Sequence, residues 1–339
     1  MFAPKARAIK SIAHATPTVS PVRLLALLVT LLILLACERR TPPSVPSTSP
    51  RPARLVPLSP AVAIILRDLG HAPRIVGRHA YDFVLDPALP VCGDQAGIDY
   101  EALLRVNPTH VFTQWGAREL PERLVALAAE RGWTLRDARL LTLADIEATL
   151  LNLDAAALDR DPAAPPSPAA ALQIARLNEA LRPRAGAQAA GRVLLLMSTS
   201  PTAAALGPGS FHHQVLERLG AAPALATGAP YITLDAEDLL RLNPDAVVVI
   251  APRAFGAPAA SRPATGAALE GRLGILATLP IRALEAGRVA LIDDPLALTP
   301  STAIADFATE LGRILDAWAT APADPSARPA NAPGVPSDP

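Results

Sequence analysis

One stretch of thirteen residues occurs twice in this chain and indicates an internal duplication. Residues 99–111 read DYEALLRVNPTHV, and residues 235–247 read DAEDLLRLNPDAV. Eight of the thirteen positions are identical, at an offset of 235 − 99 = 136. Asp99 and Asp235 are placed to cap a short helix, because a carboxylate can accept hydrogen bonds from its free N–H groups. Asn-Pro then ends each helix, since the residue before proline avoids the helical conformation.

An apolar segment follows each copy of the repeat. The segments are HVFTQ at 110–114 and AVVVIAP at 246–252. Near-continuous apolar runs are typical of parallel strands that are covered on both faces. A helix that leads into such a strand is an α/β unit, so the pattern predicts two α/β lobes.

A second match lies upstream of the first. LRDLGHAP at 66–73 matches LERLGAAP at 216–223 in five of eight positions, at an offset of 216 − 66 = 150. Each copy comes after an apolar strand, RLVPL at 54–58 and RVLLLM at 192–197. Both lobes are therefore expected to follow the same order of strand, helix, helix and strand.

The first lobe contains an insertion. The two offsets differ by 150 − 136 = 14, which places fourteen extra residues between Pro73 and Asp99. Loops that follow strands often carry function, and this one is rich in polar and aromatic groups. A passive surface elaboration is the alternative. The side chains of interest here are His79, Tyr81, Asp82, Asp86, Cys92 and Asp94.

The ends of the chain differ in composition from the rest. Residues 1–37 are expected to be a lipoprotein signal peptide, because basic residues precede a 13-residue apolar run, shorter than the ~20 residues of a membrane span. LLAC at 34–37 resembles a bacterial lipobox, which makes Cys37 the expected lipidation site and the membrane anchor. An ordinary signal peptide or membrane anchor is the alternative. Residues 38–53 are expected to form a disordered Pro/Ser-rich tether, and residues 320–339 a disordered tail.

The overall composition argues against several classes of protein. The 339 residues carry a formal net charge of zero, so nothing favours a nucleic-acid partner. The sequence has no Gly-rich phosphate loop, nucleophile elbow or zinc-protease motif, which makes an enzyme the least favoured class. If Cys37 is lipidated, Cys92 has no disulfide partner. Cys92 is expected to be a small buried side chain, with a soft metal ligand as the alternative.

Residues 167–190 separate the lobes and are expected to form one bridging helix. The segment begins with Ser-Pro, which suits an N-cap and a first helical turn. Pro183 is expected to kink the helix or end it early. The predicted fold class is therefore α/β, with two similar lobes of mainly parallel sheet at 54–160 and 191–319 joined by one long backbone helix.

These pieces together resemble the periplasmic binding proteins for vitamin B12, haem and ferric siderophores, and most closely those for vitamin B12. The resemblance covers nearly all of residues 54–319. The segments that carry it are RLVPLSPAVAIILRDLG (54–70), RIVGR (74–78), YEALLRVNPTHVF (100–112), SFHHQVLERLG (210–220) and AEDLLRLNPDAVVVI (236–250).

The resemblance implies a class III periplasmic binding protein, with a function to match. Such a protein is a solute-binding lipoprotein of an ABC importer, exported from the cytoplasm and anchored in the cell envelope by its N-terminal lipid. It captures a corrinoid, haem or ferric chelate between its lobes and delivers that ligand to the permease and ATPase subunits. It needs no cofactor of its own, and we expect a monomer.

The resemblance also implies how the protein meets its permease. In such proteins one glutamate on each lobe pairs with permease arginines, and the matching residues are Glu101 and Glu237. The alternative is that both are ordinary helix-start residues. An acidic side chain in a first helical turn is favoured by ~0.3–1 kcal/mol through the helix dipole.

Six residues are the candidates for ligand binding. Flat apolar side chains at strand ends suit a planar macrocycle, and imidazole or phenolate can coordinate haem iron. Core packing is the alternative for each aromatic residue, and helix capping for the serine. VCGDQAGI at 91–98 is small and polar where vitamin B12-binding proteins can place an aromatic residue, which weakens the case for cobalamin. The candidates are Ser59, His79, Tyr81, Trp115, Phe211 and Tyr231.

A receptor for bare zinc or manganese is the second hypothesis. It would need several His, Asp or Glu side chains that converge from both lobes. The spacing of the possible ligands gives this hypothesis no support. Those residues are His79, Asp82, Asp94, His212 and Asp294.

Overall fold

The computed structural model describes residues 52–94, 96–116, 118–257 and 267–320. The predicted signal peptide, residues 38–51 of the predicted tether and the tail from residue 321 lie outside the described residues. Lipidation at Cys37 therefore stays a prediction.

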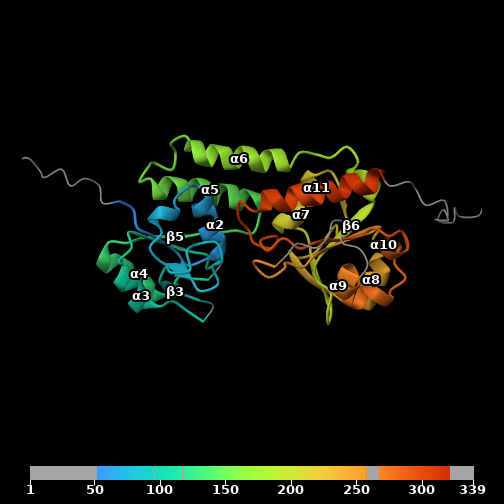
Figure 1. Ribbon diagram of the computed structural model, residues 1–339, viewed down its shortest axis with the longest axis horizontal. Helices are drawn as coiled ribbons and strands as arrows, with labels where there is room; N and C mark the ends of the chain where they lie inside the picture. The colour runs from blue at the N-terminus through green and yellow to red at the C-terminus, as the bar shows by residue number, and fades with distance from the viewer. Residues whose placement is uncertain (1–51, 95, 117, 258–266, 321–339) are drawn as a thin grey trace, which may run out of the picture. The chain divides into compact units, whose positions relative to one another are not determined.

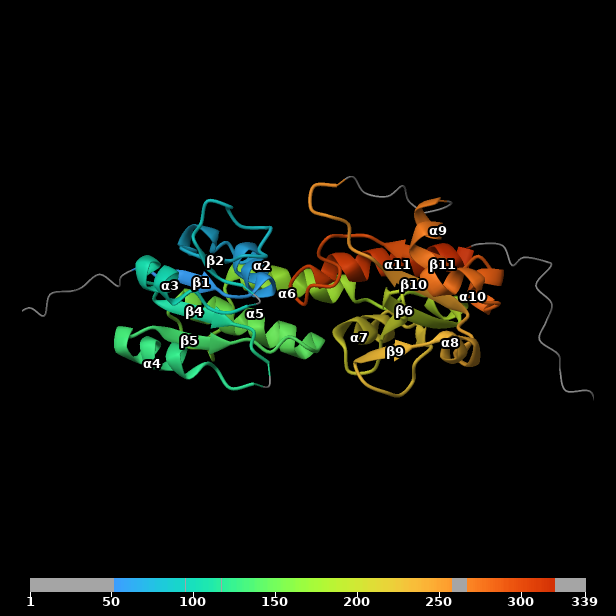
Figure 2. The same cartoon turned by 90° about the horizontal axis from the view of Figure 1, so that it is seen from below.

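The N-terminal lobe is built on a three-stranded parallel sheet with the order β1-β4-β5 (Figure 2). Ile75 bridges Leu55 in parallel on the side of β1 away from β4. The insertion forms a separate two-stranded parallel sheet, β2-β3. The elements are β1 (Leu55–Pro57), α2 (Pro60–Asp68), η1 (Ala72–Arg74), β2 (Arg78–His79), β3 (Val91–Gly93), α3 (Tyr100–Val106), β4 (His110–Thr113), α4 (Glu122–Arg131), β5 (Thr134–Asp137) and α5 (Leu143–Ala157).

The C-terminal lobe repeats this arrangement and extends it. β8, β6, β10 and β11 pair in parallel in that order, which matches the order of Ile75, β1, β4 and β5. β7 pairs antiparallel with the last residues of β6, and β9 pairs antiparallel with β7 and forms the edge of the sheet. The elements are β6 (Arg192–Ser198), β7 (Ala203–Leu206), α7 (Phe211–Arg218), β8 (Ala222–Pro223), β9 (Tyr231–Leu234), α8 (Ala236–Leu242), β10 (Ala246–Ile250), α9 (Ala267–Leu273), η3 (Gly274–Thr278), α10 (Arg282–Glu285), β11 (Val289–Ile292) and α11 (Ile304–Thr320).

Both faces of each central sheet are buried, as the near-continuous apolar strands predict. In the N-terminal lobe, Leu55 and Phe112 belong to one buried cluster, and Val56 and Val111 belong to another on the opposite face. Alternate residues of β6 and β10 divide in the same way between two clusters. The predicted α/β class with two lobes of mainly parallel sheet is confirmed.

One of these clusters is continuous through both lobes. It contains Ile65 of α2, Leu150 of α5, Val215 of α7 and Leu311 of α11. The lobes thus have separate sheets but share part of one apolar core, so they are joined by packing as well as by the chain.

The bridging helix is shorter than the predicted range of 167–190. Helix α6 covers Pro168–Ala180, and the Ser167 hydroxyl caps it by accepting a hydrogen bond from Ala170 N–H. The helix ends at Leu181, two residues before Pro183, because proline removes a backbone donor and crowds the preceding turn. A separate 3-10 turn, η2 (Ala187–Ala190), follows. Helix α6 packs against α5 and α11 (Figure 1).

Candidate functional site

The carboxyl ends of β1, β4 and β5 bring polar groups of the N-terminal lobe to one edge of the sheet, the usual place for ligands in such sheets. The buried Ser59 hydroxyl donates to Gln114 Oε1 at 2.6 Å and accepts from Val62 N–H, as the N-cap of α2. Asp137 Oδ1 accepts from the Trp115 backbone N–H at 2.7 Å. The backbone that carries Trp115 is therefore fixed, and Ser59 has the capping role that the sequence left as an alternative.

His79 and Tyr81 both belong to the insertion, but their side chains lie in different environments. His79 is buried, and its Nδ1 accepts a hydrogen bond from the Tyr81 backbone N–H at 3.2 Å. Burial lowers the pKa of His79, although a hydrogen bond to the Asp94 backbone and the carboxylates of Asp94 and Asp82 oppose that shift. A neutral imidazole in this position supports the loop, whereas the Tyr81 side chain is 50% exposed and can reach a ligand.

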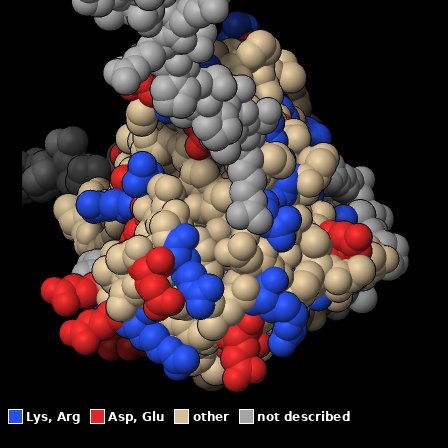
Figure 3. Space-filling view, turned by 90° about the vertical axis from the view of Figure 1, so that its left-hand side faces the viewer, with Lys and Arg blue, Asp and Glu red and all other residues tan. Residues whose placement is uncertain are grey.

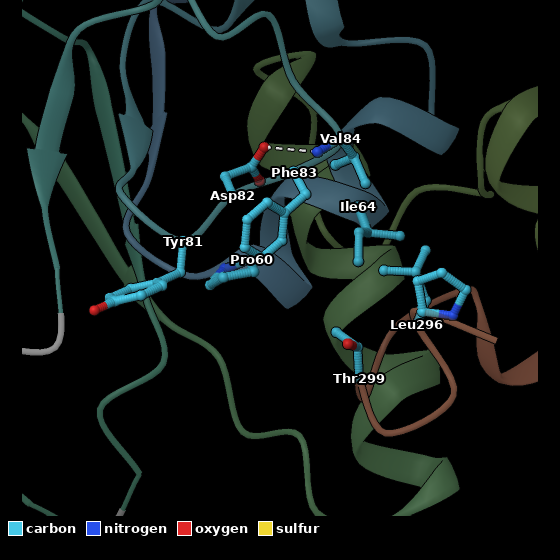
Figure 4. Close-up of a pocket in the computed structure, with 9 residues that line it drawn as sticks. Pro60, Ile64, Tyr81, Asp82, Phe83, Val84, Leu296 and Thr299 are labelled. Atoms are coloured by element: carbon cyan, nitrogen blue, oxygen red, sulfur yellow. Dashed lines mark hydrogen bonds between the residues drawn. The ribbon is translucent and has the colours of Figure 1, made fainter. Parts of the chain in front are cut away.

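A cavity of about 220 Å³ lies between this loop and the C-terminal lobe (Figure 4). Its walls come from the start of α2, from the insertion, and from the segment that links β11 to α11. Most of these side chains are apolar, and Asp82 and Thr299 add polar groups. The lining residues are Pro60, Ile64, Tyr81, Asp82, Phe83, Val84, Pro295, Leu296 and Thr299.

Asp82 fixes the backbone of the loop that forms one wall of the cavity. The side chain is buried, and its Oδ1 accepts from Val84 N–H at 3.0 Å and from Leu85 N–H at 2.8 Å. This aspartate turn holds the backbone on both sides of Phe83. The Phe83 ring itself is 63% exposed and stacks on Phe255 of the C-terminal lobe, with ring centroids 5.6 Å apart and planes 26° apart.

The opposite wall is anchored by α7. His212 Nε2 lies 2.8 Å from the Ala297 carbonyl oxygen and donates to it. Burial lowers the pKa of His212 to about 4, while its hydrogen bond to the Ala297 backbone opposes the shift. His212 is thus neutral at physiological pH and holds the segment that carries Pro295, Leu296 and Thr299.

Of the six predicted ligand residues, Tyr81 lines the cavity and the other five do not. Phe211 is 1% exposed and lies in the shared core, where its ring is tilted against that of His212 with 3.9 Å between the centroids. It therefore has the core packing that the sequence left as the alternative. Trp115 and Tyr231 are partly exposed, but neither lines the cavity. Burial of part of the ring raises the pKa of Tyr231.

Phe83 and Phe255 are not among the six candidates that the sequence offers. Both follow strand ends in sequence, so the signal was present. Their stacking across the two lobes joins residues that are far apart in the chain, and no local pattern contains it.

The repeated helices α3 and α8 display their glutamates in the same way. Asp99 and Asp235 cap the two helices, which confirms the predicted capping. Glu101 and Glu237 stand in the first turns, and both are exposed. Glu237 pairs with Arg241 one turn later at 2.8 Å.

Cys92 is a buried free cysteine, as expected. Burial raises the pKa of its thiol to about 11, with the charge of Asp99 adding to the shift. Metals bind the thiolate, so this protonated thiol is a poor ligand. Among the residues that the structure describes, no three His, Cys, Asp or Glu side chains are grouped as a metal site requires, and nothing there favours a bare-metal receptor.

Acidic and basic side chains are intermingled on the face that Figure 3 shows. In the described part of the chain, none of the helices has both the length and the apolar character needed to cross a bilayer.

No family profile and no curated protein sequence matches this chain. Solved structures do match it. The vitamin B12-binding protein BtuF of Vibrio cholerae has a TM-score of 0.58 at 17% identity, over 79% of this chain and 99% of that one. The haem-binding protein RhuT of Roseiflexus, in its apo form, has a TM-score of 0.57 at 19% identity, over 80% and 100%.

The periplasmic haem-binding protein BhuT, solved with two haems, has a TM-score of 0.57 at 23% identity, over 79% of this chain and 99% of that one. These likenesses show that the chain has the fold of periplasmic haem- and vitamin B12-binding proteins, which confirms the fold that the sequence resemblance implied.

Proposed function

We propose that this protein is the solute-binding subunit of an ABC importer and captures a metal-containing chelate, either a corrinoid, haem or a ferric siderophore. The observation that carries the proposal is the cavity between the lobes, with Tyr81 and Phe83 on one wall and Leu296 on the other. Flat apolar side chains with a few polar groups are what a large chelate requires. The solved structures of similar fold are proteins that bind haem, vitamin B12 or iron.

Within the insertion, Tyr81 is the residue that we propose as a metal ligand. It belongs to the cavity lining and is half exposed, with its hydroxyl directed away from the other labelled side chains in Figure 4, and a phenolate can be an axial ligand of ferric haem. His79 supports this position through the bond from Tyr81 N–H to its Nδ1.

The proposal extends to delivery of the ligand. Glu101 and Glu237 occupy equivalent exposed positions on α3 and α8, and Leu104 and Leu240 are exposed one turn after them. Two copies of one acidic and apolar surface suit a permease that offers two copies of a basic site. An exposed ion pair is individually weak, so both surfaces would have to engage together. Export and a lipid anchor at Cys37 complete the proposed role.

The test is a titration of the full-length protein in detergent with haem, with cobalamin and with a ferric hydroxamate. A shift in the absorbance of the bound chelate, with tight saturable binding of one of them, is the expected result. Tyr81→Phe should change the spectrum of bound haem if the phenolate coordinates iron. Absence of binding to all three chelates, together with tight binding of Zn²⁺ alone, would refute the proposal.

A further inference from the structure

The Phe83–Phe255 pair is an unusual feature next to the cavity. Phe83 is 63% exposed and Phe255 is 47% exposed, although large apolar rings are normally buried. The two rings come from different lobes and stack nearly face to face, with 5.6 Å between their centroids. Phe83 belongs to the cavity lining, so the stack ties that wall of the cavity to the C-terminal lobe.

The backbone beneath each ring is fixed independently of the stack. Asp82 Oδ1 holds the N–H groups of Val84 and Leu85. Arg253 holds the segment that carries Phe255, because its Nε donates to the Ala257 carbonyl oxygen at 3.0 Å and its Nη1 to the Asp293 carbonyl oxygen at 3.1 Å. Opening of the stack is therefore a rotation of side chains, which is fast and needs no unfolding of the loops.

The size of the cavity shows that something must move when a chelate binds. Its volume is about 220 Å³, whereas sites for small molecules usually have ~300–1,000 Å³. Phe83 lines the cavity and is 63% exposed, with its ring stacked on Phe255. Rotation of this exposed ring is therefore the simplest way to enlarge the cavity.

The geometry of the stack favours a flat ligand. Aromatic faces in contact lie roughly 3.5 Å apart, so a planar ring inserted between two phenyl rings needs about 7 Å. The 5.6 Å between the ring centroids includes the sideways offset of the stack, so one ring has to rotate outward by about one ring thickness, roughly 3.5 Å, to admit the ligand. A flat ligand then replaces one ring–ring contact with two ring–ligand contacts, but a rounded siderophore has no flat face to offer.

We infer that Phe83 and Phe255 form an aromatic clamp that opens to hold a planar tetrapyrrole between the two lobes. The inference rests on the proposed function and narrows it from metal chelates in general to flat macrocycles. Since the clamp acts on the faces of the macrocycle, it should work for a porphyrin that contains no metal.

The experiment compares full-length wild type with Phe83→Ala, Phe255→Ala and the double variant. The ligands are haem and metal-free protoporphyrin, followed by Soret absorbance and by quenching of tryptophan fluorescence. Wild type should bind both ligands, and each single variant should bind both roughly tenfold more weakly. The double variant should lose little more than either single variant, because the two rings act as one clamp. Leu172→Ala is the matched control, because Leu172 is an exposed apolar residue on α6, outside the cavity lining. This variant should bind as wild type does.

Several outcomes would overturn the inference without touching the proposed function. Unchanged affinity in both single variants, or tighter and faster binding in them, would mean that the stack is at most a barrier to entry. Binding of haem but not of metal-free protoporphyrin by wild type would mean that the metal carries recognition. Wild type that binds a ferric hydroxamate and no tetrapyrrole would likewise refute the clamp. Failure of wild type to bind any chelate would refute the proposed function itself.

Discussion

The N-terminal and C-terminal lobes end their repeated helices with the same backbone geometry. Asn107 and Asn243 both adopt the left-handed conformation, at φ 45° and φ 39°, and each donates its N–H to a leucine carbonyl four residues earlier. Arg54 directly precedes β1 and Arg192 is the first residue of β6. Their guanidinium groups donate to the last carbonyls of α3 and α8.

The lobes differ at one position of this arrangement. Thr109 and Asp245 are equivalent in the repeat, and each accepts the backbone N–H of the arginine, at 2.8 Å and 2.9 Å. Only the carboxylate can titrate. The duplication thus preserved the hydrogen-bond geometry, while the chemistry of the acceptor was free to change.

A larger difference between the lobes lies in the segments that each one inserts between the strands and helices they share. Leu58 and Ser59 alone connect β1 to α2, whereas residues 199–210, including β7, connect β6 to α7. The N-terminal lobe places its addition after η1 instead, where it forms β2, β3 and the wall with Tyr81 and Phe83. The two walls of the cavity are therefore unrelated by the duplication, so the ligand meets different side chains on each side.

The largest effect, on ligand uptake, should come from removing the exposed glutamate that both repeated helices carry. Glu101→Ala combined with Glu237→Ala should abolish ligand uptake in cells, because each lobe loses its carboxylate for the permease. Affinity for the ligand should stay at the wild-type value, since both helices lie outside the cavity lining. Each single variant should reduce uptake roughly tenfold, as expected for the loss of about 1.4 kcal/mol. Normal uptake by the double variant would show that the glutamates are only helix-start residues.

The second effect tests a group that only the C-terminal lobe has. His212 occupies the first turn of α7, where α2 has Ala61 and Val62. Its folded pKa of about 4 lies below the unfolded value of 6.5, so the unfolded state binds protons first as the pH falls. Stability is lost from pH 6.5 downward and the loss is complete below about pH 4. Between pH 7.5 and pH 5, His212 should cost about 2 kcal/mol.

Urea denaturation of wild type and of His212→Leu at both pH values measures this cost. The burial of His71, His79 and His110 also lowers their pKa values, but those residues are present in both proteins, so the difference isolates His212. Equal acid sensitivity of the two proteins would contradict the assignment.

A third and smaller effect concerns Asp245 and Thr109. Asp245 loses solvation on folding, but hydrogen bonds from Arg192 N–H and Arg282 outweigh this and lower its pKa. A lowered pKa stabilises the fold above the unfolded value near 3.8 and the benefit disappears as the pH falls through the folded pKa. Asp245→Thr should therefore cost about 1 kcal/mol at pH 7 and less at pH 3.5. Thr109→Val is the matched variant, and the stability that it loses should not depend on pH in this range. Equal pH dependence of the two variants would contradict the proposed difference between Asp245 and Thr109.

The smallest effect concerns the two helix ends. Asn107→Gly should stabilise the protein by a few tenths of a kcal/mol, because glycine adopts the left-handed conformation without a side-chain clash. Asn243→Gly should instead cost about 1 kcal/mol, since Asn243 Oδ1 accepts from Arg282 N–H at 2.9 Å. Thermal unfolding of both variants gives the sign of each stability change. The same sign at both sites would contradict the expected difference between Asn107 and Asn243.

The sequence predicted part of the candidate site and missed the rest for a clear reason. The insertion, Tyr81 and the exposed glutamates follow from the offsets between the repeats and from local helix signals. Phe211 and Phe83 are both aromatic residues near strand ends, yet Phe211 is buried beside His212, whose ring meets Phe307 edge-on, and Phe83 faces the cavity. Which of them is buried depends on contacts with residues about a hundred or more positions away.

By itself the sequence determined the duplication, the helix caps at Asp99 and Asp235, the buried parallel strands and the α/β class. Each of these depends on interactions within a few residues, so each leaves a local pattern. Only the tertiary structure decided which side chains line the cavity. It alone brought Phe83 to Phe255, because that contact is created when two separately folded sheets pack on a shared core.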